Sequence, residues 1–199
     1  MSILEQVVQT IKRKNTIKKV VIVGSGPVGK TSLLQLLKMP EVSILDDKTK
    51  YARTPFMNID TKKISDETSH QSGLLQFYDL AGQIDLPIHA LKDFSSQVLG
   101  HTDIILLVFA NNNLQSFLDL KMWYQLVKDG LKQCDDTKKQ SKLILINNKM
   151  DLESTVDNSL IDYFQEIDSQ FKGVFKVSCV TKEGINDLST WLEKELFTN

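Results

Sequence analysis

The sequence predicts an α/β fold with a mostly parallel central sheet, one antiparallel edge strand and helices on both faces. Short continuous runs of aliphatic residues recur along the chain, and stretches with helical periodicity separate them. Continuous apolar runs are typical of strands that are buried on both faces, and alternation of strands with helices implies a parallel sheet covered by helices. Residues 56–65 alternate more weakly and precede the polar segment 67–73, which favours an antiparallel hairpin at the sheet edge.

Size and composition indicate one packed domain. The chain has 199 residues, of which 41% are hydrophobic and 25% charged, as in ordinary globular proteins. The formal net charge is -1, so no global positive field holds a nucleic-acid backbone, and we expect no nucleic-acid partner. The two cysteines match neither a disulfide framework nor a metal-ligand spacing. No apolar stretch reaches the roughly 18 residues that span a bilayer. These features favour a cytoplasmic protein, either free or peripheral on a membrane.

The first element that we expect is an amphipathic helix. Apolar side chains within residues 3–11 would share one helical face, and a basic run at 12–14 follows. We therefore assign residues 1–17 to an N-terminal amphipathic helix and residues 18–199 to the main domain. The sequence leaves two roles open for this helix. Its apolar face docks on the domain, or it makes weak contact with a membrane surface.

The remaining elements follow in order along the chain. We expect core strands at residues 19–23, 74–78, 104–109, 143–146 and 174–177. We expect helices at residues 31–37, 117–131, 160–171 and 185–196. Residues 39–55 and 82–100 are the least regular stretches, and they are long enough to be functional loops.

A glycine-rich loop follows the first expected strand. Residues 24–31 read GSGPVGKT and satisfy the GxxxxGK[ST] pattern between a strand and a helix, which predicts a P-loop NTPase fold. The glycines let the backbone curl around a phosphate, and the amides and the helix N-terminus supply positive potential. Lys30 is expected to reach the outer phosphates, and the Thr31 hydroxyl to bind magnesium. The candidate phosphate-binding residues of this loop are Ser25, Gly26, Pro27, Val28, Gly29, Lys30, Thr31 and Ser32.

A second motif, NKMD at residues 148–151, predicts the choice of base. It follows the expected strand 143–146, at the sheet edge where ligands of open α/β sheets bind. A carboxylate in the purine plane accepts hydrogen bonds from N1–H and N2–H2 of guanine, whereas adenine offers no donor at either position. Asp151 is therefore expected to select guanine. The Asn148 amide can satisfy the other edge of the base, and the Lys149 stem can lie over the ring.

A third motif, DLAGQ at residues 79–83, ends the expected strand 74–78 and places a carboxylate beside the phosphate loop. Asp79 can hold a magnesium-bound water. Gly82 allows its backbone N–H to approach a γ-phosphate, as a further phosphate-binding residue. Gln83 is positioned to orient an attacking water.

Together these motifs resemble the Ras superfamily of small GTPases. GSGPVGKT, DLAGQ, NKMD and SCVT at residues 178–181 occur in the order and approximate spacing of that superfamily, over nearly the whole chain. Residues 54–61 are similar to the TVGFNVET stretch of Arf proteins, DLAGQ to their DLGGQ, and SCVT to their TCAT. The expected N-terminal helix is also Arf-like. Residues 83–103 are longer than in Arf or Rab proteins and resemble Rag GTPases, so the subfamily stays open.

Two departures concern lipid attachment. Ser2 stands where Arf proteins carry the glycine that is myristoylated, and the sequence ends without the cysteines that Rab and Rho proteins prenylate. We therefore expect any membrane contact to be weak and reversible.

The resemblance also implies roles for single residues. Thr54 would contribute its hydroxyl to magnesium in the GTP-bound state. The loop at 178–180 would contact the guanine carbonyl through backbone N–H groups. The candidate metal ligands are then Thr31, Thr54 and Asp79. The candidate guanine-binding residues are Asn148, Lys149, Asp151, Ser178, Cys179 and Val180. The candidate catalytic residues are Lys30, Thr54 and Gln83.

The resemblance implies a molecular switch in signalling or vesicle traffic. It would bind GTP or GDP with Mg²⁺, hydrolyse GTP to GDP, and have effector, exchange-factor and GTPase-activating proteins as partners. One alternative is a module that binds GTP or GDP without hydrolysing it. An ATP-dependent kinase with the same phosphate loop is disfavoured, because it leaves the NKMD motif unexplained.

Pro27 and Arg53 bear on the rate of hydrolysis. Proline has no backbone N–H, whereas the family resemblance implies a donor at this loop position, aimed at the oxygen between the β- and γ-phosphates. We therefore expect slow intrinsic hydrolysis with nucleotide binding preserved. The alternative is that Pro27 stiffens the loop and another donor fills the gap. Arg53 is expected to be a solvated charge, so that an external protein supplies the activating arginine.

Overall fold

A six-stranded sheet forms the centre of the computed structural model, which describes residues 16–43, 53–66, 71–134 and 140–198. The strands lie in the order β2-β3-β1-β4-β5-β6. Only the pair of β2 with β3 is antiparallel among the described strands, and the other pairs are parallel. The expected α/β fold with an antiparallel edge strand is therefore confirmed. The strands are β1 (Thr16–Val23), β2 (Met57–Asp66), β3 (Gln71–Leu80), β4 (Ile104–Ala110), β5 (Lys142–Asn148) and β6 (Phe171–Lys176).

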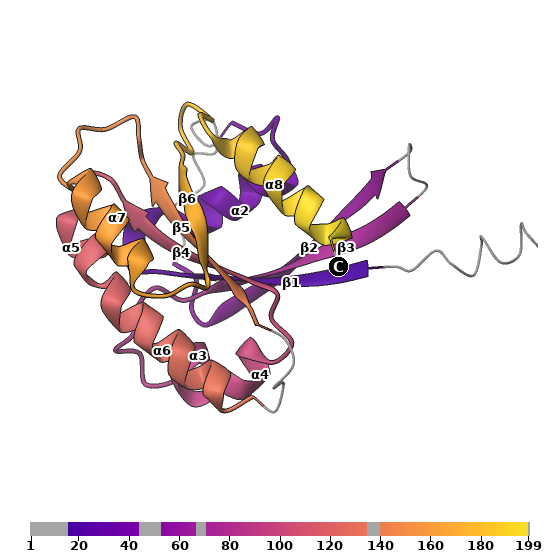
Figure 1. Cartoon of the computed structure of the whole chain (residues 1–199), viewed down its shortest axis with the longest axis horizontal. Helices are drawn as coiled ribbons and strands as arrows, with labels where there is room; N and C mark the ends of the chain where they lie inside the picture. Colours follow the sequence, from indigo (N-terminus) through magenta and orange to yellow (C-terminus); the bar gives the residue numbers. More distant parts are fainter. Residues whose placement is uncertain (1–15, 44–52, 67–70, 135–139, 199) are drawn as a thin grey trace, which may run out of the picture.

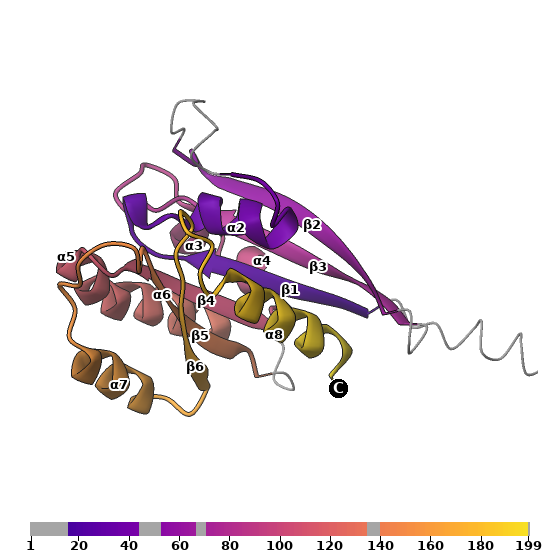
Figure 2. The same ribbon diagram turned by 90° about the horizontal axis from the view of Figure 1, so that it is seen from above.

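Helices cover both faces of the sheet (Figures 1 and 2). On one face lie α2 (Lys30–Lys38) and α8 (Ile185–Phe197). On the other face lie α3 (Ala90–Asp93), α4 (Ser95–Leu99), α5 (Leu114–Leu118), α6 (Leu120–Lys132) and α7 (Asn158–Glu166). A short 3-10 turn, η1 (Gly26–Val28), precedes α2.

The strand sequences explain why there are two cores. In β1, Val20 and Ile22 join the core under α2 and α8, whereas Val21 and Val23 join the core on the opposite face. Successive side chains of a strand point to opposite faces, so a central strand needs apolar residues at every position. All seven residues of β4 are buried for the same reason. The continuous aliphatic runs in the sequence are thus the central strands.

The expected helix at 117–131 is two helices in the structure. α5 and α6 meet at Asp119, which ends the first and precedes the second. In α6, Leu120, Trp123 and Val127 are buried at helical spacing, which fixes this helix on the sheet. The junction matters for the site, because the Asp119 carboxylate accepts a hydrogen bond from Ser25 of the phosphate loop.

Two other expectations about the elements were wrong in part. Residues 82–100, expected to be an irregular loop, contain α3 and α4, and the His89 ring accepts a hydrogen bond from Leu91 N (3.1 Å) at the start of α3. The helix expected at 160–171 ends earlier, because α7 stops at Glu166 and Phe171 opens β6. The Asp168 carboxylate accepts from Gln170 N (2.9 Å) in the turn between them.

The chain start is only partly within the described residues. β1 begins at Thr16, so residues 16 and 17 belong to the sheet and not to the N-terminal segment that the sequence predicts. The amphipathic helix expected at 3–11 lies outside the described residues. No helix in the described part of the chain has both the length and the apolar character that crossing a bilayer requires.

Candidate functional site

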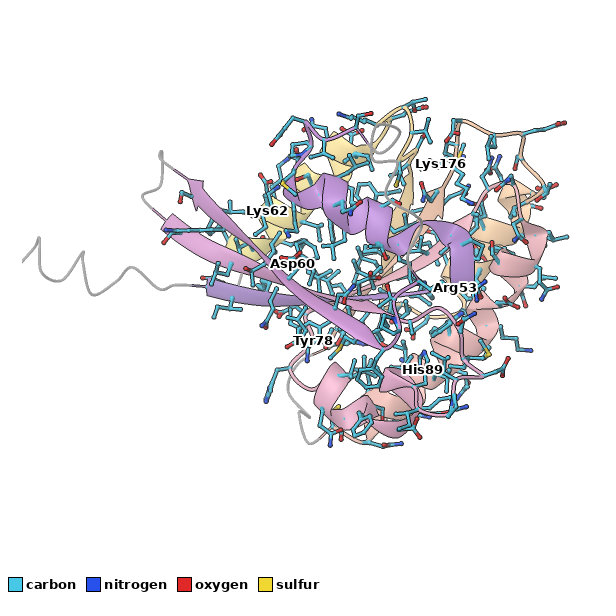
Figure 3. All side chains as sticks on the ribbon, turned by 180° about the vertical axis from the view of Figure 1, so that it is seen from behind. Arg53, Asp60, Lys62, Tyr78, His89 and Lys176 are labelled. Atoms are coloured by element: carbon cyan, nitrogen blue, oxygen red, sulfur yellow. The ribbon has the colours of Figure 1, made fainter. Side chains whose placement is uncertain are left out.

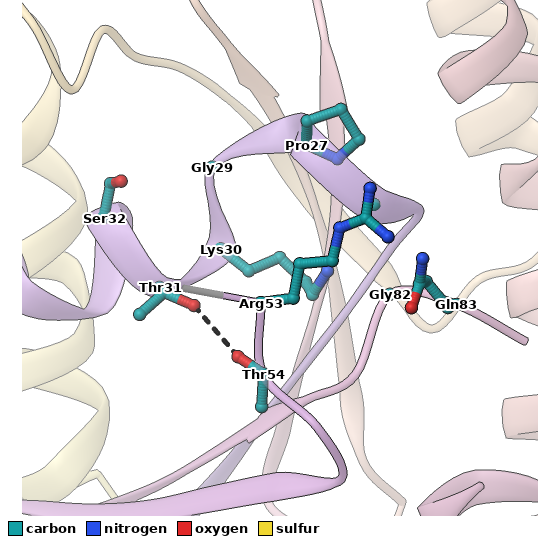
Figure 4. Close-up of a pocket in the computed structure, with 10 residues that line it drawn as sticks. Pro27, Gly29, Lys30, Thr31, Ser32, Arg53, Thr54, Gly82 and Gln83 are labelled. Carbon is teal, nitrogen blue, oxygen red and sulfur yellow. Dashed lines mark hydrogen bonds between the residues drawn. The ribbon is translucent and has the colours of Figure 1, made fainter. Parts of the chain in front are cut away.

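Three segments from distant parts of the sequence line one pocket beyond the end of β1 (Figure 4). They are the phosphate loop, the first-switch segment (residues 53–56), and the two residues after Ala81. Most of the expected phosphate-binding residues therefore lie together, with Thr54 and Gln83 beside them. The lining residues are Gly26, Pro27, Gly29, Lys30, Thr31, Ser32, Arg53, Thr54, Gly82 and Gln83.

Two glycines shape the floor of this pocket. Gly29 has φ 92°, in the left-handed region, and a Cβ there would lie 2.4 Å from Asn148 Nδ2. A Cβ on Gly82 would lie 2.6 Å from Lys30 Nζ and 2.7 Å from Gly26 N. The backbone at these two positions therefore approaches its neighbours more closely than any side chain would allow.

Ser25 and Val28 differ from the other loop residues in where their side chains go. The Val28 side chain is buried in the core. The Ser25 hydroxyl donates to Asp119 Oδ2 (2.7 Å) and accepts from Trp123 Nε1 (3.1 Å). Any contact of these two residues with phosphate would come from their backbone amides, because both side chains are committed to the protein.

Lys30 is the buried cation of the pocket. Its Nζ donates to Gly24 O (2.8 Å) and Ser25 O (3.3 Å), so the ammonium lies under the loop. Burial lowers the pKa of Lys30 to about 8, and the nearby Asp79 carboxylate acts in the opposite direction. Because a bound polyphosphate would favour the charged form, the site is built to gain from an anion.

Three side-chain oxygens converge at the candidate metal position. Thr31 Oγ1 donates to Asp79 Oδ2 (2.6 Å), Thr54 Oγ1 donates to the same atom (3.3 Å), and the two hydroxyls are 3.2 Å apart. The second oxygen, Asp79 Oδ1, is buried and has no hydrogen-bond partner. Burial raises the pKa of Asp79, and the Thr31 hydrogen bond and the Lys30 charge oppose this. Hard oxygen ligands around an unsatisfied carboxylate fit Mg²⁺.

The candidate guanine contacts lie after β5 and β6. Asp151 Oδ1 accepts a hydrogen bond from the Ser178 hydroxyl (2.5 Å), and Ser178 Oγ in turn accepts from Val180 N (3.2 Å) and Thr181 N (3.0 Å). Asp151 itself is exposed. The resemblance implies a backbone contact for Ser178, and the structure adds side-chain hydrogen bonds that the motif does not indicate.

Asn148 joins the two halves of the site. Its Nδ2 donates to Val28 O in the phosphate loop (2.8 Å), and its Oδ1 accepts from Lys149 N (2.8 Å). Lys149 has φ 64°, which turns the chain away from β5 toward Asp151. The structure thus gives Asn148 a positioning role. The contact of its amide with the base stays a prediction.

The other guanine-loop residues lie close to these. Cys179 is buried, and burial raises the pKa of its thiol to about 11. Val180 is exposed beside it. Among the catalytic candidates, Gln83 is exposed at the pocket rim. Val180 and Gln83 are therefore both exposed to solvent, and their contacts with a nucleotide stay predictions.

Several residues at the site were missed by the sequence reasoning. Asp119 and Trp123 hold Ser25 through the hydrogen bonds above, although they are 94 and 98 positions away in the chain. The buried His89 ring bonds Ala81 O (3.0 Å) and lies 5.7 Å from the Trp123 ring, so it supports the segment that carries Gly82. No local sequence pattern predicts such contacts, because each one forms only when two distant segments of the chain come together.

Comparisons with known proteins agree with this geometry. The family model described as Ras family matches residues 19–196. The chain is 26% identical to the Ras-related protein RABG1 of Arabidopsis thaliana, over 91% of this chain and 83% of that protein. It is 30% identical to the Ras-related proteins RabV and Rab-32D of Dictyostelium discoideum, over 75% and 72% of this chain. It spans only 57% and 58% of those two proteins. With the match to its family model covering nearly the whole domain, this chain belongs to the Ras family of small GTPases.

Proposed function

We propose that this protein is a switch that binds GTP or GDP with Mg²⁺ and hydrolyses GTP slowly without an activating protein. The main support for this proposal is the hydrogen bond that connects the two halves of the site. The Asn148 amide connects the phosphate loop to the segment that presents Asp151. This contact supports a single ligand with its guanine at Asp151 and its polyphosphate at Lys30.

In hydrolysis, water attacks the γ-phosphorus, the bond from that phosphorus to the β–γ bridging oxygen breaks, and GDP and phosphate leave. The Lys30 ammonium neutralises the outer phosphates from below, and Gln83 orients the water at the rim. Thr31, Thr54 and Asp79 would hold the ion. When bound, Mg²⁺ neutralises charge on the phosphates.

Slow hydrolysis is inferred from Pro27, which lines the pocket but offers no N–H. A donor aimed at developing charge stabilises the transition state more than the ground state, and removing one costs on the order of 3 kcal/mol in other enzymes. Lys30, the other loop amides and the ion still hold the nucleotide. Binding is therefore retained while the rate is low.

Single-turnover hydrolysis of GTP tests this. Pro27→Gly and Pro27→Ala both restore the N–H, and glycine loosens the loop more than alanine does. We expect both variants to hydrolyse GTP at least roughly tenfold faster than the unaltered chain at similar GTP affinity. Unchanged or slower rates in both would reject the missing-donor account.

Gln83→Leu should keep GTP affinity and lose hydrolysis, and an equal loss of both would make Gln83 a binding residue.

A second candidate, a GTP- or GDP-binding module that does not hydrolyse, is favoured by the same proline. The same assay separates the two, because such a module binds GTP and releases no phosphate at any time.

The proposed partners are effectors, exchange factors and activating proteins that read or change the state of the switch, in signalling or vesicle traffic. We further propose a cytoplasmic location, with weak membrane contact through residues 3–11. Co-sedimentation with anionic vesicles in the GDP and GTP-analogue states tests that contact. Equal absence of binding in both states would reject it.

A further inference from the structure

The Arg53 side chain reaches into the phosphate pocket. In Figure 4 it extends from the first-switch segment across the pocket, with its guanidinium directed to the side of Pro27 and Gln83. Figure 3 shows Arg53 before the start of β2, apart from Asp60 and Lys62 further along that strand. Arg53 is exposed, as expected for a solvated charge, and its side chain also lines the pocket.

The charge around the pocket suits a polyanion. Its described lining residues include two cations, Lys30 and Arg53, and no carboxylate. Lys30 is buried under the loop, whereas Arg53 is exposed at the mouth. Within the described ranges, no side chain forms a hydrogen bond or an ion pair with the Arg53 guanidinium. None of its five N–H donors is therefore occupied by a side chain of the described ranges.

The backbone beside Arg53 is held on both sides of the site. The Thr54 hydroxyl contacts Thr31 (3.2 Å) and Asp79 (3.3 Å). Phe56 O accepts from Ala81 N (2.9 Å), and the Phe56 ring packs edge-on against Phe94 at 5.8 Å. These contacts hold the segment against Thr31, the end of β3 and the residue between α3 and α4, so the Arg53 side chain extends from a fixed backbone.

We propose that Arg53 is a catalytic residue that supplies an arginine from within the chain, and this rests on the proposed function. Its guanidinium donates to the γ-phosphate and to the β–γ bridging oxygen, where negative charge grows as the bond to the γ-phosphorus breaks. The attacking water gives its proton to the released phosphate, and GDP leaves with the bridging oxygen. Arg53 thereby offsets, from the pocket mouth, part of the stabilisation that is lost with the Pro27 N–H, and hydrolysis without an activating protein stays slow.

The alternative is a cation that only strengthens binding of the γ-phosphate. Such a residue would act equally on ground state and transition state, so its loss would weaken GTP affinity and leave the rate of bound GTP unchanged. Loss of a donor that acts only in the transition state would instead leave GTP affinity unchanged and lower the rate of hydrolysis of bound GTP. Affinity and single-turnover rate therefore distinguish the two roles.

The test compares Arg53→Ala, Arg53→Lys and the unaltered chain, with Lys63→Ala as control, since Lys63 is an exposed cation of β2 outside the pocket. GTP and GDP affinities are measured first. We expect Arg53→Ala to cut the single-turnover rate by roughly tenfold or more at similar affinity, because an arginine at this position is worth up to several orders of magnitude. Arg53→Lys should keep only part of the single-turnover rate, and Lys63→Ala should hydrolyse GTP at the rate of the unaltered chain.

A second readout does not depend on turnover. Aluminium fluoride with GDP mimics the transferring phosphoryl group, and we expect the unaltered chain, but not Arg53→Ala, to retain it without an activating protein. A third measurement uses Pro27→Gly as background. If Arg53 replaces the missing loop donor, Arg53→Ala should cost less there than in the unaltered chain.

The outcomes separate the two claims. If the unaltered chain does not bind GTP, the proposed function itself is wrong. If it binds and hydrolyses GTP while Arg53→Ala matches it in rate and in aluminium fluoride retention, only the role of Arg53 is overturned. Loss of GTP affinity alone in Arg53→Ala, or no hydrolysis by an unaltered chain that binds GTP, also overturns that role.

Discussion

The guanine side and the phosphate side of the site differ in how their polar groups are satisfied. On the guanine side, the Asp151 carboxylate is already oriented by Ser178, which is itself held by two backbone N–H groups. On the phosphate side, Lys30 donates to loop carbonyls and Thr31 donates to Asp79, while Asp79 Oδ1 has no hydrogen-bond partner. The first side is built without a ligand, and the second is left incomplete.

This difference indicates how each side of the site would contribute to the free energy of nucleotide binding. A preorganised acceptor such as Asp151 costs little to bind a base, so it serves selection. Lys30 and Asp79 are buried charges whose environment disfavours the ionised form, so a bound polyphosphate and cation relieve that cost. Under the proposed function, the phosphate side would respond to the bound polyphosphate, and the guanine side would select the base.

The largest effect is expected from Lys30→Ala, which removes the buried cation of the phosphate side. A hydrogen bond to a charged group contributes about 1.5–3 kcal/mol, and Lys30 has two donors to redirect to phosphate. GTP and GDP affinity should fall by about 100-fold or more, measured by titration with a fluorescent GDP. Lys63→Ala is the matched control. Unaltered nucleotide retention in Lys30→Ala would undermine the assignment of the whole pocket.

Asp151→Asn is expected to change which base the site prefers and to leave the contacts with the polyphosphate intact. The amide presents a donor where guanine also presents one, so GTP affinity should fall about 100-fold, and xanthosine triphosphate should bind better than it does to the parent. The Ser178 hydroxyl can still donate to the new side chain, so the melting temperature should change little. GTP affinity equal to that of the parent would count against Asp151 as the base-selecting residue.

These sites could be predicted from sequence to the extent that each is a local motif. The residues of GSGPVGKT and NKMD carry their chemistry within one loop each, and the continuous runs such as 104–109 identify buried strands. What could not be predicted depends on distant segments meeting. The Ser25 contacts with Asp119 and Trp123, and the direction of Arg53, have no local signature.

Element ends were the other weak point. α3 and α4 have four and five residues, which is too short to establish a helical period within 82–100. Phe171 extended the apolar pattern of α7, and only the turn at Asp168, whose carboxylate satisfies Gln170 N, separates it into β6. Burial of Phe171 alone fits either element.

Ser178→Ala with and without a chelator of Mg²⁺ tests whether the two sides are independent. Loss of the hydroxyl removes the donor to Asp151 and the acceptor for two N–H groups, so GDP release should be about tenfold faster. The chelator should accelerate release through the phosphate side. Distant, independent sites give additive free energies, so the two factors should multiply. A combined factor far below their product would contradict the comparison.

The smallest effect concerns pH. Phosphate needs the protonated Lys30, whose pKa of about 8 lies below its ordinary value. As pH rises from 7 to 8.5, the protonated fraction falls and GDP affinity should drop about fourfold. For the chain without nucleotide, the stability of the fold changes with pH in the opposite direction to the GDP affinity. Between about 8 and the ordinary lysine pKa the folded state binds fewer protons than the unfolded state, so stability rises with pH. Lys30→Ala should show neither trend.

Competition of GTP and ATP for a fluorescent GDP on the unaltered chain tests the central claim most directly. Both nucleotides carry the same triphosphate and draw equally on the phosphate side, so any preference reports the guanine side alone. Sites built to hydrogen-bond a ligand reject analogues that lack the donors by factors of about 10⁴. The account predicts displacement by GTP at concentrations about a thousandfold or more below those of ATP. Equal displacement by the two nucleotides would contradict it.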